Sequence, residues 1–365
     1  MTMTNTAPEH HGMANASPLG LVLSGGGAKG AYQAGVWKAL VEMGFAERIT
    51  AISGTSVGAI NATAFASIRD PDQIRAIWHD RISSVVSPNF KAFSTIEVLT
   101  AIEQWLEGKQ FPLHGILDRD SVSEILSATI PEPWPADTPA VHATTLEARG
   151  ASFGELDRSS YKKVRFRIDQ ETDPGIRIKK VLASCAIPWC YSPVEIDGKR
   201  YVDGGWDSMG GENIPVQPIL KKHPGIRTLI VVRCNSRDLE PEEIRLSRHP
   251  DINLVEIRPS TPLPGIFDIQ NLGGGILMGA LFPGLSTGMI FKAALAAISG
   301  FFMTRQAKVW GATLAFSPVF TDQFFDAGYK DTLVALDQHR LNLLSNSNGN
   351  STLVGRDRVH FITRK

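Results

Sequence analysis

Residues 19–68 read LGLVLSGGGAKGAYQAGVWKALVEMGFAERITAISGTSVGAINATAFASI, and this stretch decides the fold. It opens on a short continuous apolar run, Leu19–Ser24, which is typical of a strand buried on both faces of a sheet. A glycine-rich turn, Gly25–Gly30, then leads into helical apolar spacing over Ala31–Met43. Gly44 stands where a C-terminal helix cap is expected.

The same pattern repeats at once. Ile49–Ser53 is a second apolar strand, and Gly54–Gly58 is a sharp turn into the small-residue helix AINATAFASI. Two strand–turn–helix units in succession predict parallel βαβ geometry. The sequence therefore predicts an α/β fold with a central, mostly parallel sheet flanked by helices.

Further elements continue the alternation without an internal repeat or a low-complexity linker. We expect mostly helical structure over residues 70–136 and a helix at Ile178–Ser184. The dipeptide Asp197-Gly198 predicts a hairpin turn between two short strands. Strands are also expected at Ala140–Leu146, Val164–Ile168, Val194–Ile196, Arg200–Val202, Thr228–Arg233 and Leu254–Ile257.

Length and charge exclude several classes of protein. The chain has 365 residues, of which 43% are hydrophobic, so disorder over the whole chain is excluded. It carries 37 basic and 37 acidic side chains. This balance argues against nucleic acid as the main partner, because a phosphate backbone requires a basic face. A membrane surface remains open as a partner, since apolar contacts also hold a protein there.

Residues 1–18 are polar and contain no apolar core of the kind found in a secretory signal peptide. We expect a flexible tail here, no signal peptide and a cytoplasmic location. A tail of this composition is also compatible with a dedicated export machine.

The turn Gly54-Thr55-Ser56-Val57-Gly58 fits the pattern G-x-S-x-G between a predicted strand and a predicted helix. The two glycines let the backbone pack closely around a strained serine at the carboxyl end of the strand. The start of the following helix places a positive dipole beside a developing oxyanion. Ser56 is therefore a candidate nucleophile; the alternative is a plain turn with a serine helix cap.

The turn GGGAKG has three interpretations. Gly25, Gly27 and Gly30 satisfy the dinucleotide pattern G-x-G-x-x-G, but the second strand ends in Ser53–Ser56 without the acidic residue that a ribose requires. A P-loop is excluded because no G-K-[ST] follows. Consecutive glycines beside a nucleophile elbow favour an oxyanion hole built from backbone N–H groups.

The candidate partner of Ser56 is an aspartate. Seven histidines follow Ser56, and none stands at a glycine-rich strand end. Tyr201–Gly205 instead places Asp203 directly after an apolar strand and before two glycines. Such an aspartate can reach a serine hydroxyl across neighbouring strand ends, although Asp203-Gly204 would also serve as a simple turn.

The three motifs SGGGAKG (Ser24–Gly30), GTSVG (Gly54–Gly58) and DGG (Asp203–Gly205) together resemble the patatin-like phospholipase signature, in the same order. The resemblance covers about Leu19–Val216, a little over half of the chain. It implies a three-layer α/β fold, a Ser–Asp dyad without histidine, lipid acyl hydrolase activity and no metal or other cofactor. Since the chain contains no internal repeat or linker, we expect one domain: the tail, then a patatin-like domain over residues 19–216, and a C-terminal extension over residues 217–365 packed on the same domain.

The resemblance implies a role for each residue of the motifs. Ser56 would be the nucleophile and Asp203 the general base. The remaining positions would line the oxyanion hole (Gly25, Gly26, Gly27 and the Val57 N–H), complete its loop (Lys29, Gly30), frame the elbow (Gly54, Gly58) or follow the aspartate (Gly204, Gly205).

The expected activity is that of a phospholipase A or lysophospholipase acting on a lipid ester. Two alternatives remain: an esterase or thioesterase for soluble acyl substrates, and a catalytically silent lipid-binding protein on the same fold. The oligomeric state is left open.

The segment Leu272–Met303 is unusually apolar, with Lys292 as its only charged residue. Its length would suit a membrane span, but Pro283-Gly284 interrupts it and many of its residues are small. The alternatives are a helical pair or lid on the core, and a surface resting in the lipid interface. We expect some lipid contact, with anchors at Phe282, Leu285, Met289, Ile290, Phe301, Phe302 and Met303.

Overall fold

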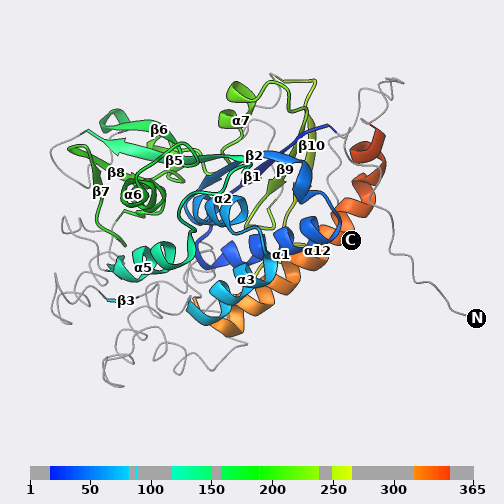
Figure 1. Cartoon of the computed structure of the whole chain (residues 1–365), viewed down its shortest axis with the longest axis horizontal. Helices are drawn as coiled ribbons and strands as arrows, with labels where there is room; N and C mark the ends of the chain where they lie inside the picture. Colours follow the sequence, from blue (N-terminus) through cyan, green and yellow to red (C-terminus); the bar gives the residue numbers. More distant parts are fainter. Residues whose placement is uncertain are drawn as a thin grey trace, which may run out of the picture.

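An eight-stranded sheet organises the computed structural model (Figure 1), which describes residues 17–81, 87–88, 117–149, 158–188, 190–237, 249–264 and 316–345. The strand order is β10-β9-β1-β2-β5-β8-β7, and β6 pairs with β5 beside this path. The strands are β1 (Leu19–Leu23), β2 (Ile49–Thr55), β5 (Ala140–Ala148), β6 (Tyr161–Arg167), β7 (Val194–Ile196), β8 (Lys199–Asp203), β9 (Thr228–Val232) and β10 (Asn253–Ile257).

The five strands from β10 to β5 run parallel, which confirms the predicted βαβ geometry and the mostly parallel sheet. The strands β6 and β8 run antiparallel to β5, and β7 runs antiparallel to β8. The predicted hairpin joins β7 to β8, with positive φ angles of 51° at Asp197 and 71° at Gly198. Two successive positive φ values match the primed turn that a tight hairpin favours.

Helices cover both faces of the sheet, as the three-layer prediction requires (Figure 1). On one face lie α1 (Gly30–Glu42), α2 (Val57–Ser67), α6 (Pro174–Ser184) and α12 (Pro318–Ser345), while α7 (Gln217–Lys222) lies on the other. Side chains of β1 alternate between the two layers, since Leu21 and Leu23 join the larger core and Val22 joins the smaller one. The apolar run of β1 is thus buried on both faces.

Helix α1 ends as predicted at a glycine in the left-handed conformation, with a φ of 75° at Gly44. The N–H of Phe45 donates to the carbonyl of Leu40 at 2.9 Å, and the N–H of Gly44 donates to Val41 at 3.0 Å. This pair of bonds is a Schellman motif, which turns the chain back toward β2.

One part of the fold, residues 70–136, differs from the expectation. The helical prediction for residues 70–136 holds for α3 (Pro71–Ala76), a π-helical turn at Ile77–Arg81 and α5 (Asp120–Thr129). It is wrong at Ser87–Pro88 and Leu117–Asp118, which form a short antiparallel pair, β3 and β4. Pro88 has no N–H to donate within a helix, and the residue before a proline is biased toward extended backbone, so a strand pair forms there instead.

The chain beyond residue 216 completes the sheet, because β9 lies between β1 and β10. The long helix α12, for which no helix was predicted, packs along α1 (Figure 1). Their backbones approach closely: a Cβ added to Gly328 would lie 2.0 Å from the Tyr32 carbonyl oxygen. The Tyr329 hydroxyl also donates to Glu42 Oε2 at 2.6 Å.

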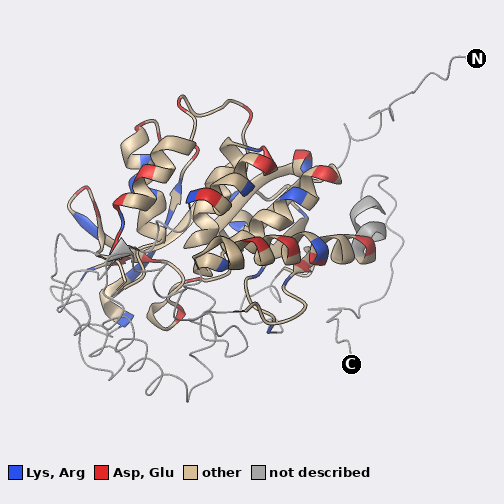
Figure 2. Cartoon of the chain, turned by 90° about the horizontal axis from the view of Figure 1, so that it is seen from below, with Lys and Arg blue, Asp and Glu red and all other residues tan. Residues whose placement is uncertain are grey.

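Acidic and basic residues are mixed along the helices on the side shown in Figure 2. Within the described ranges, no helix is both long and apolar enough to cross a bilayer. The polar tail up to residue 16 and the apolar segment 272–303 lie outside the described residues, so their interpretations stay predictions.

Candidate active site

Two strand ends meet at the site. Thr55, the last residue of β2, pairs with Thr144 of β5, and Asp203, the last residue of β8, pairs with the adjacent Thr145. Because β6 occupies the other edge of β5, β2 and β8 share one edge and run toward each other along it. The carboxyl ends of β2 and β8 therefore bring Ser56 and Asp203 to neighbouring positions, although 147 residues separate them in the chain.

Ser56 occupies a strained elbow between β2 and α2. Its φ of 56° and ψ of −130° are unusual for a residue with a side chain. A Cβ on Gly54 would lie 2.1 Å from the Gly58 carbonyl oxygen, so the turn closes this tightly only with glycine. The Ser56 side chain makes no capping hydrogen bond to α2, which removes the interpretation of a serine helix cap.

Hydrogen bonds with Ser184 and Cys185 hold the backbone of the elbow, and neither residue was predicted to belong to the site. The Ser56 N–H donates to Ser184 Oγ at 2.9 Å, and Ser184 Oγ donates to the Thr144 carbonyl at 2.6 Å. The Cys185 thiol donates to the Ser56 carbonyl at 3.1 Å. The end of α6 thus fixes the Ser56 backbone to β5. No local pattern in residues 183–188 (ASCAIP) predicts this contact.

Asp203 is buried, with 5% of its surface exposed, and its Oδ1 accepts the Gly205 N–H at 2.7 Å. Burial raises the pKa of its carboxyl from the usual 3.8 to about 6, against the lowering effects of the Ser56 hydroxyl and the Gly205 N–H. Its Oδ2 is buried and accepts no hydrogen bond from the described residues. A buried, unsatisfied carboxylate oxygen next to a serine hydroxyl is able to accept a proton.

The glycine loop presents backbone donors beside Ser56. A Cβ on Gly25 would lie 3.2 Å from the Ser56 Cβ, so loop and elbow are in close contact. The Gly25 N–H is occupied, because it donates to the Asn213 carbonyl at 3.2 Å. The N–H groups of Gly26, Gly27 and Val57 donate to no acceptor among the described residues.

Lys29 and Gly30 shape the loop rather than offer donors. The Lys29 N–H donates to the Gly26 carbonyl at 3.3 Å. The Gly30 N–H donates to the carbonyls of Ala28 and Gly27. The Lys29 side chain is buried, and burial lowers the pKa of its ammonium group, partly offset by the Cys234 thiol.

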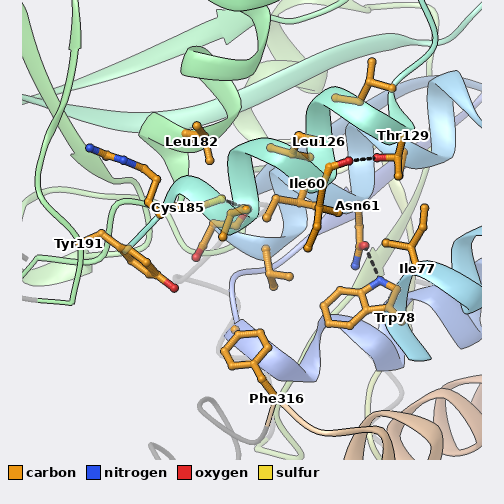
Figure 3. A pocket seen from close by; sticks show the side chains of 18 of the residues that line it. Ile60, Asn61, Ile77, Trp78, Leu126, Thr129, Leu182, Cys185, Tyr191 and Phe316 are labelled. Atoms are coloured by element: carbon orange, nitrogen blue, oxygen red, sulfur yellow. Dashed lines mark hydrogen bonds between the residues drawn. The ribbon is translucent and has the colours of Figure 1, made fainter. Parts of the chain in front are cut away.

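An apolar pocket of about 100 Å³ lies against Ser56 (Figure 3). The indole N–H of Trp78 donates to Asn61 Oδ1 at 3.1 Å, so these polar groups are paired within the wall. Among the described residues that line the pocket, none is a histidine. Most lining side chains are aliphatic or aromatic, including Val57, Ile60, Ala64, Ile74, Ile77, Trp78, Val122, Ile125, Leu126, Leu182, Tyr191 and Phe316.

The family model for patatin-like phospholipase matches residues 21–220. Patatin-like phospholipase domain-containing protein 7 of Rattus norvegicus is 41% identical over 224 residues, which cover 60% of this chain and 14% of that protein. The uncharacterized protein YqhO of Bacillus subtilis is 26% identical over 206 residues, covering 50% of this chain and 62% of that protein. The chain therefore spans less than two thirds of each of these relatives.

Solved structures with a similar chain path include VipD from Legionella pneumophila, with a TM-score of 0.44 and 14% identity, covering 88% of this chain and 67% of that one. Human GIVD cytosolic phospholipase A2 gives a TM-score of 0.40 and 10% identity, covering 91% of this chain and 60% of that one. The family model spans more than half of the sequence and includes all three motifs. The chain belongs to the patatin-like phospholipase family.

Proposed function

We propose that this protein is a lipid acyl hydrolase that cleaves a carboxylic ester through an acyl-Ser56 intermediate, with Asp203 as the general base. One observation carries the proposal: a strained Ser56 and a buried Asp203 meet at two strand ends beside an apolar pocket. Family membership supports the same conclusion.

In the first half of the reaction, Ser56 Oγ attacks the ester carbonyl carbon while its proton passes to the Asp203 carboxylate. The carbonyl oxygen takes up the negative charge of the tetrahedral intermediate. The N–H groups of Gly26, Gly27 and Val57 are the available donors for that oxygen. Each such donor is worth on the order of 10²–10³ in rate.

Collapse of the intermediate breaks the bond to the leaving alcohol, which receives the proton from Asp203. In the second half, Asp203 takes a proton from water, and the resulting hydroxide oxygen attacks the acyl-Ser56 carbonyl. The second intermediate releases the fatty acid and returns the proton to Ser56 Oγ. With a phospholipid substrate, the first product is a lysophospholipid.

The pocket supports a lipid over a soluble acyl substrate. Most of its wall is built from apolar side chains of α2, α3, α5 and α6, with Phe316 from the segment before α12, and Arg119 is the one charged residue that lines it within the described part of the chain. Such a wall removes an acyl chain from water, and each buried CH₂ contributes roughly 0.8 kcal/mol. A short polar acyl group would gain little there.

The experiment compares Ser56→Ala and Asp203→Asn with the unchanged protein on phospholipid vesicles and on a short-chain nitrophenyl ester. Each substitution should lower kcat by about 10³-fold or more, and the double variant should be scarcely slower than either. Matched controls are Ser127→Ala on the exposed face of α5 and Asp251→Asn at the protein surface. Both should keep full turnover.

Three outcomes would contradict the proposal. Near-normal turnover of Asp203→Asn would remove Asp203 as the base. Hydrolysis of the nitrophenyl ester alone would favour an esterase for soluble substrates. Vesicle binding without hydrolysis of either substrate would indicate a silent lipid-binding protein.

A further inference from the structure

Two consecutive residues, Glu212 and Asn213, join all three motifs through their backbone. The Glu212 N–H donates to the Gly204 carbonyl at 2.8 Å, which fixes the turn after Asp203. The Glu212 carbonyl accepts the Thr55 hydroxyl at 2.8 Å, which fixes the end of β2 before the elbow. The Asn213 carbonyl accepts the Gly25 N–H at 3.2 Å, which fixes the glycine loop.

This connecting segment is anchored to the sheet by charge. The Glu212 carboxylate, with its side chain 10% exposed, accepts hydrogen bonds from Arg165 and, at 3.3 Å, from Lys163 of β6. Its other oxygen accepts the Gln217 N–H at 3.2 Å, at the start of α7. Two cations and a helix start thus hold Glu212, and Asn213 follows directly.

The Asn213 side chain reaches between the two halves of the site. A Cβ on Gly25 would lie 2.5 Å from Asn213 Oδ1, and a Cβ on Gly205 would lie 2.8 Å from it. The Cβ position on Gly25 also lies 3.2 Å from the Ser56 Cβ, and the Cβ position on Gly205 lies 3.1 Å from Asp203 Oδ1. The amide fits there because neither glycine carries a side chain.

We propose that Asn213 is a positioning residue that sets the alignment of Ser56 with Asp203. Its carbonyl holds the glycine loop in place, and its side chain keeps the loop and the turn after Asp203 at a fixed separation. This inference rests on the proposed function of the Ser56–Asp203 pair. A displacement of about 1 Å at a reacting group costs on the order of 10² in rate, so a spacer at this point controls turnover.

The first variant is Asn213→Ala, which removes only the amide. It keeps the bond from the Gly25 N–H and the bond that the Asn213 N–H donates to Asp207 Oδ1 at 3.1 Å. We expect kcat on the nitrophenyl ester to fall about 10–100-fold, while KM stays within about twofold, since the side chain aligns the reacting groups and does not bind the acyl chain. The rate at which an alkyl fluorophosphonate labels Ser56 should fall in parallel. This labelling also reports alignment if ester turnover is slow.

The second variant is Asn213→Asp, which keeps the shape of the side chain and adds a negative charge. A second carboxylate near Asp203 raises the pKa of its carboxyl, because like charges disfavour ionisation. The acid limb of the kcat/KM profile should therefore move to higher pH by on the order of one unit. This shift reports that the side chain at position 213 lies beside Asp203, whereas the fall in kcat and in labelling rate reports its role in alignment. Asn253→Asp at the start of β10 is the matched control and should leave the limb in place.

The outcomes separate this inference from the proposed function. Full activity of Ser56→Ala would reject the proposed function. An inactive Ser56→Ala, together with normal kcat and a normal labelling rate in Asn213→Ala, would overturn the role of Asn213 alone. If Asn213→Ala fails to fold, Asn213→Ser, which also removes the amide, takes its place in the kcat and labelling measurements.

Discussion

Among single residues, Asp203 shows the sharpest conflict between stability and chemistry. A general base must be ionised, yet the buried site at the end of β8 disfavours the ionised form and raises the pKa of Asp203 to about 6. Its only hydrogen bond from the backbone comes from Gly205, and its Oδ2 is left unsatisfied among the described residues. The carboxylate is therefore a stronger base than an exposed aspartate, at some cost in folding free energy.

The first consequence concerns the pH dependence of activity. If Asp203 accepts the serine proton, kcat/KM should fall as the pH drops through about 6, because the protonated carboxyl has no capacity to accept another proton. Nitrophenyl ester hydrolysis measured between about pH 4 and pH 8 checks this. An acid limb near the ordinary aspartate pKa of about 3.9 would show that Asp203 is not the buried base.

The second consequence is that removing the charge should stabilise the fold. A folded-state pKa above the unfolded one means that Asp203 favours folding at low pH, and this contribution is lost as the pH rises through about 6. At pH 8, Asp203→Asn should raise the free energy of unfolding by on the order of 1–3 kcal/mol.

Urea unfolding at pH 8 and near pH 4 measures this difference, and the gain should shrink at the lower pH. The exposed Asp251→Asn serves as the control without a comparable gain. Equal stability of Asp203→Asn and the unchanged protein at pH 8 would mean that the carboxylate is better solvated than its burial indicates.

At the scale of elements, the close crossing of α1 and α12 depends on two glycines, one in each helix. A Cβ on Gly35 would lie 1.9 Å from the Phe325 carbonyl oxygen, and one on Gly328 would lie 2.0 Å from the Tyr32 carbonyl oxygen. Both obstructing atoms belong to helix backbones, which have no rotamer to change. The two glycines therefore set how closely α12 packs on the face of the molecule that carries the pocket.

Gly328→Ala should force α12 away from α1 and lower the free energy of unfolding by about 1–3 kcal/mol or more. Thermal denaturation followed by circular dichroism measures the loss. Gly225→Ala is the matched control, because a Cβ there meets nothing within 4 Å. Equal melting temperatures for the two variants would show that the helices separate without cost.

At the scale of the whole molecule, a histidine pair joins the sheet to its thinner helical layer. Nε2 of His142, buried in β5, lies 2.9 Å from Nε2 of His223, at the end of α7. Burial, with Arg167 and His223 nearby, lowers the pKa of His142 to about 4, while Asp169 acts in the opposite direction. In this geometry one Nε2 donates a hydrogen bond and the other accepts it, and the tautomers of the two rings set which is which.

This pair predicts acid sensitivity of the fold. A histidine whose pKa is depressed in the folded state stabilises the fold above about pH 6.5, and that contribution is lost as the pH falls toward 4. The unchanged protein should therefore lose on the order of 2–3 kcal/mol more than His142→Gln between these values. Urea unfolding at both pH values checks it, with His249→Gln as the control. If the free energy of unfolding of His142→Gln depended on pH in the same way as that of the unchanged protein, His142 would not be the source of the acid sensitivity.

The local pattern of apolar runs and glycine turns was sufficient to predict the parallel half of the sheet. Continuous apolar runs predicted β1, β2 and β9 because strands buried on both faces need no polar alternation. The glycine turns and the Asp197-Gly198 hairpin followed from backbone conformations that few residues adopt. The antiparallel pair β3–β4 did not follow, since each strand has two residues, which are too few to form a periodic pattern, and its partner lies far along the chain.

The site divides in the same way. Ser56, Asp203 and the glycine loop were predictable because each must stand at a strand end or in a tight turn, and such turns leave a local signature. Ser184 and Asn213 carry no such signature, as they act through contacts made across 128 residues to Ser56 and 188 residues to Gly25.

By itself, the sequence determined the family and the first strands and helices of the parallel sheet, and it predicted Ser56 and Asp203 as the reactive side chains. All of these depend on neighbours along the chain. Only the tertiary structure decided that β2 and β8 meet end to end on β5 and that Gly25 gives its N–H to Asn213. It also decided that Asp203 is buried, which raises the pKa of its carboxyl to about 6. These properties depend on burial and on distances between segments far apart in the chain, and both exist only once the sheet has closed around them.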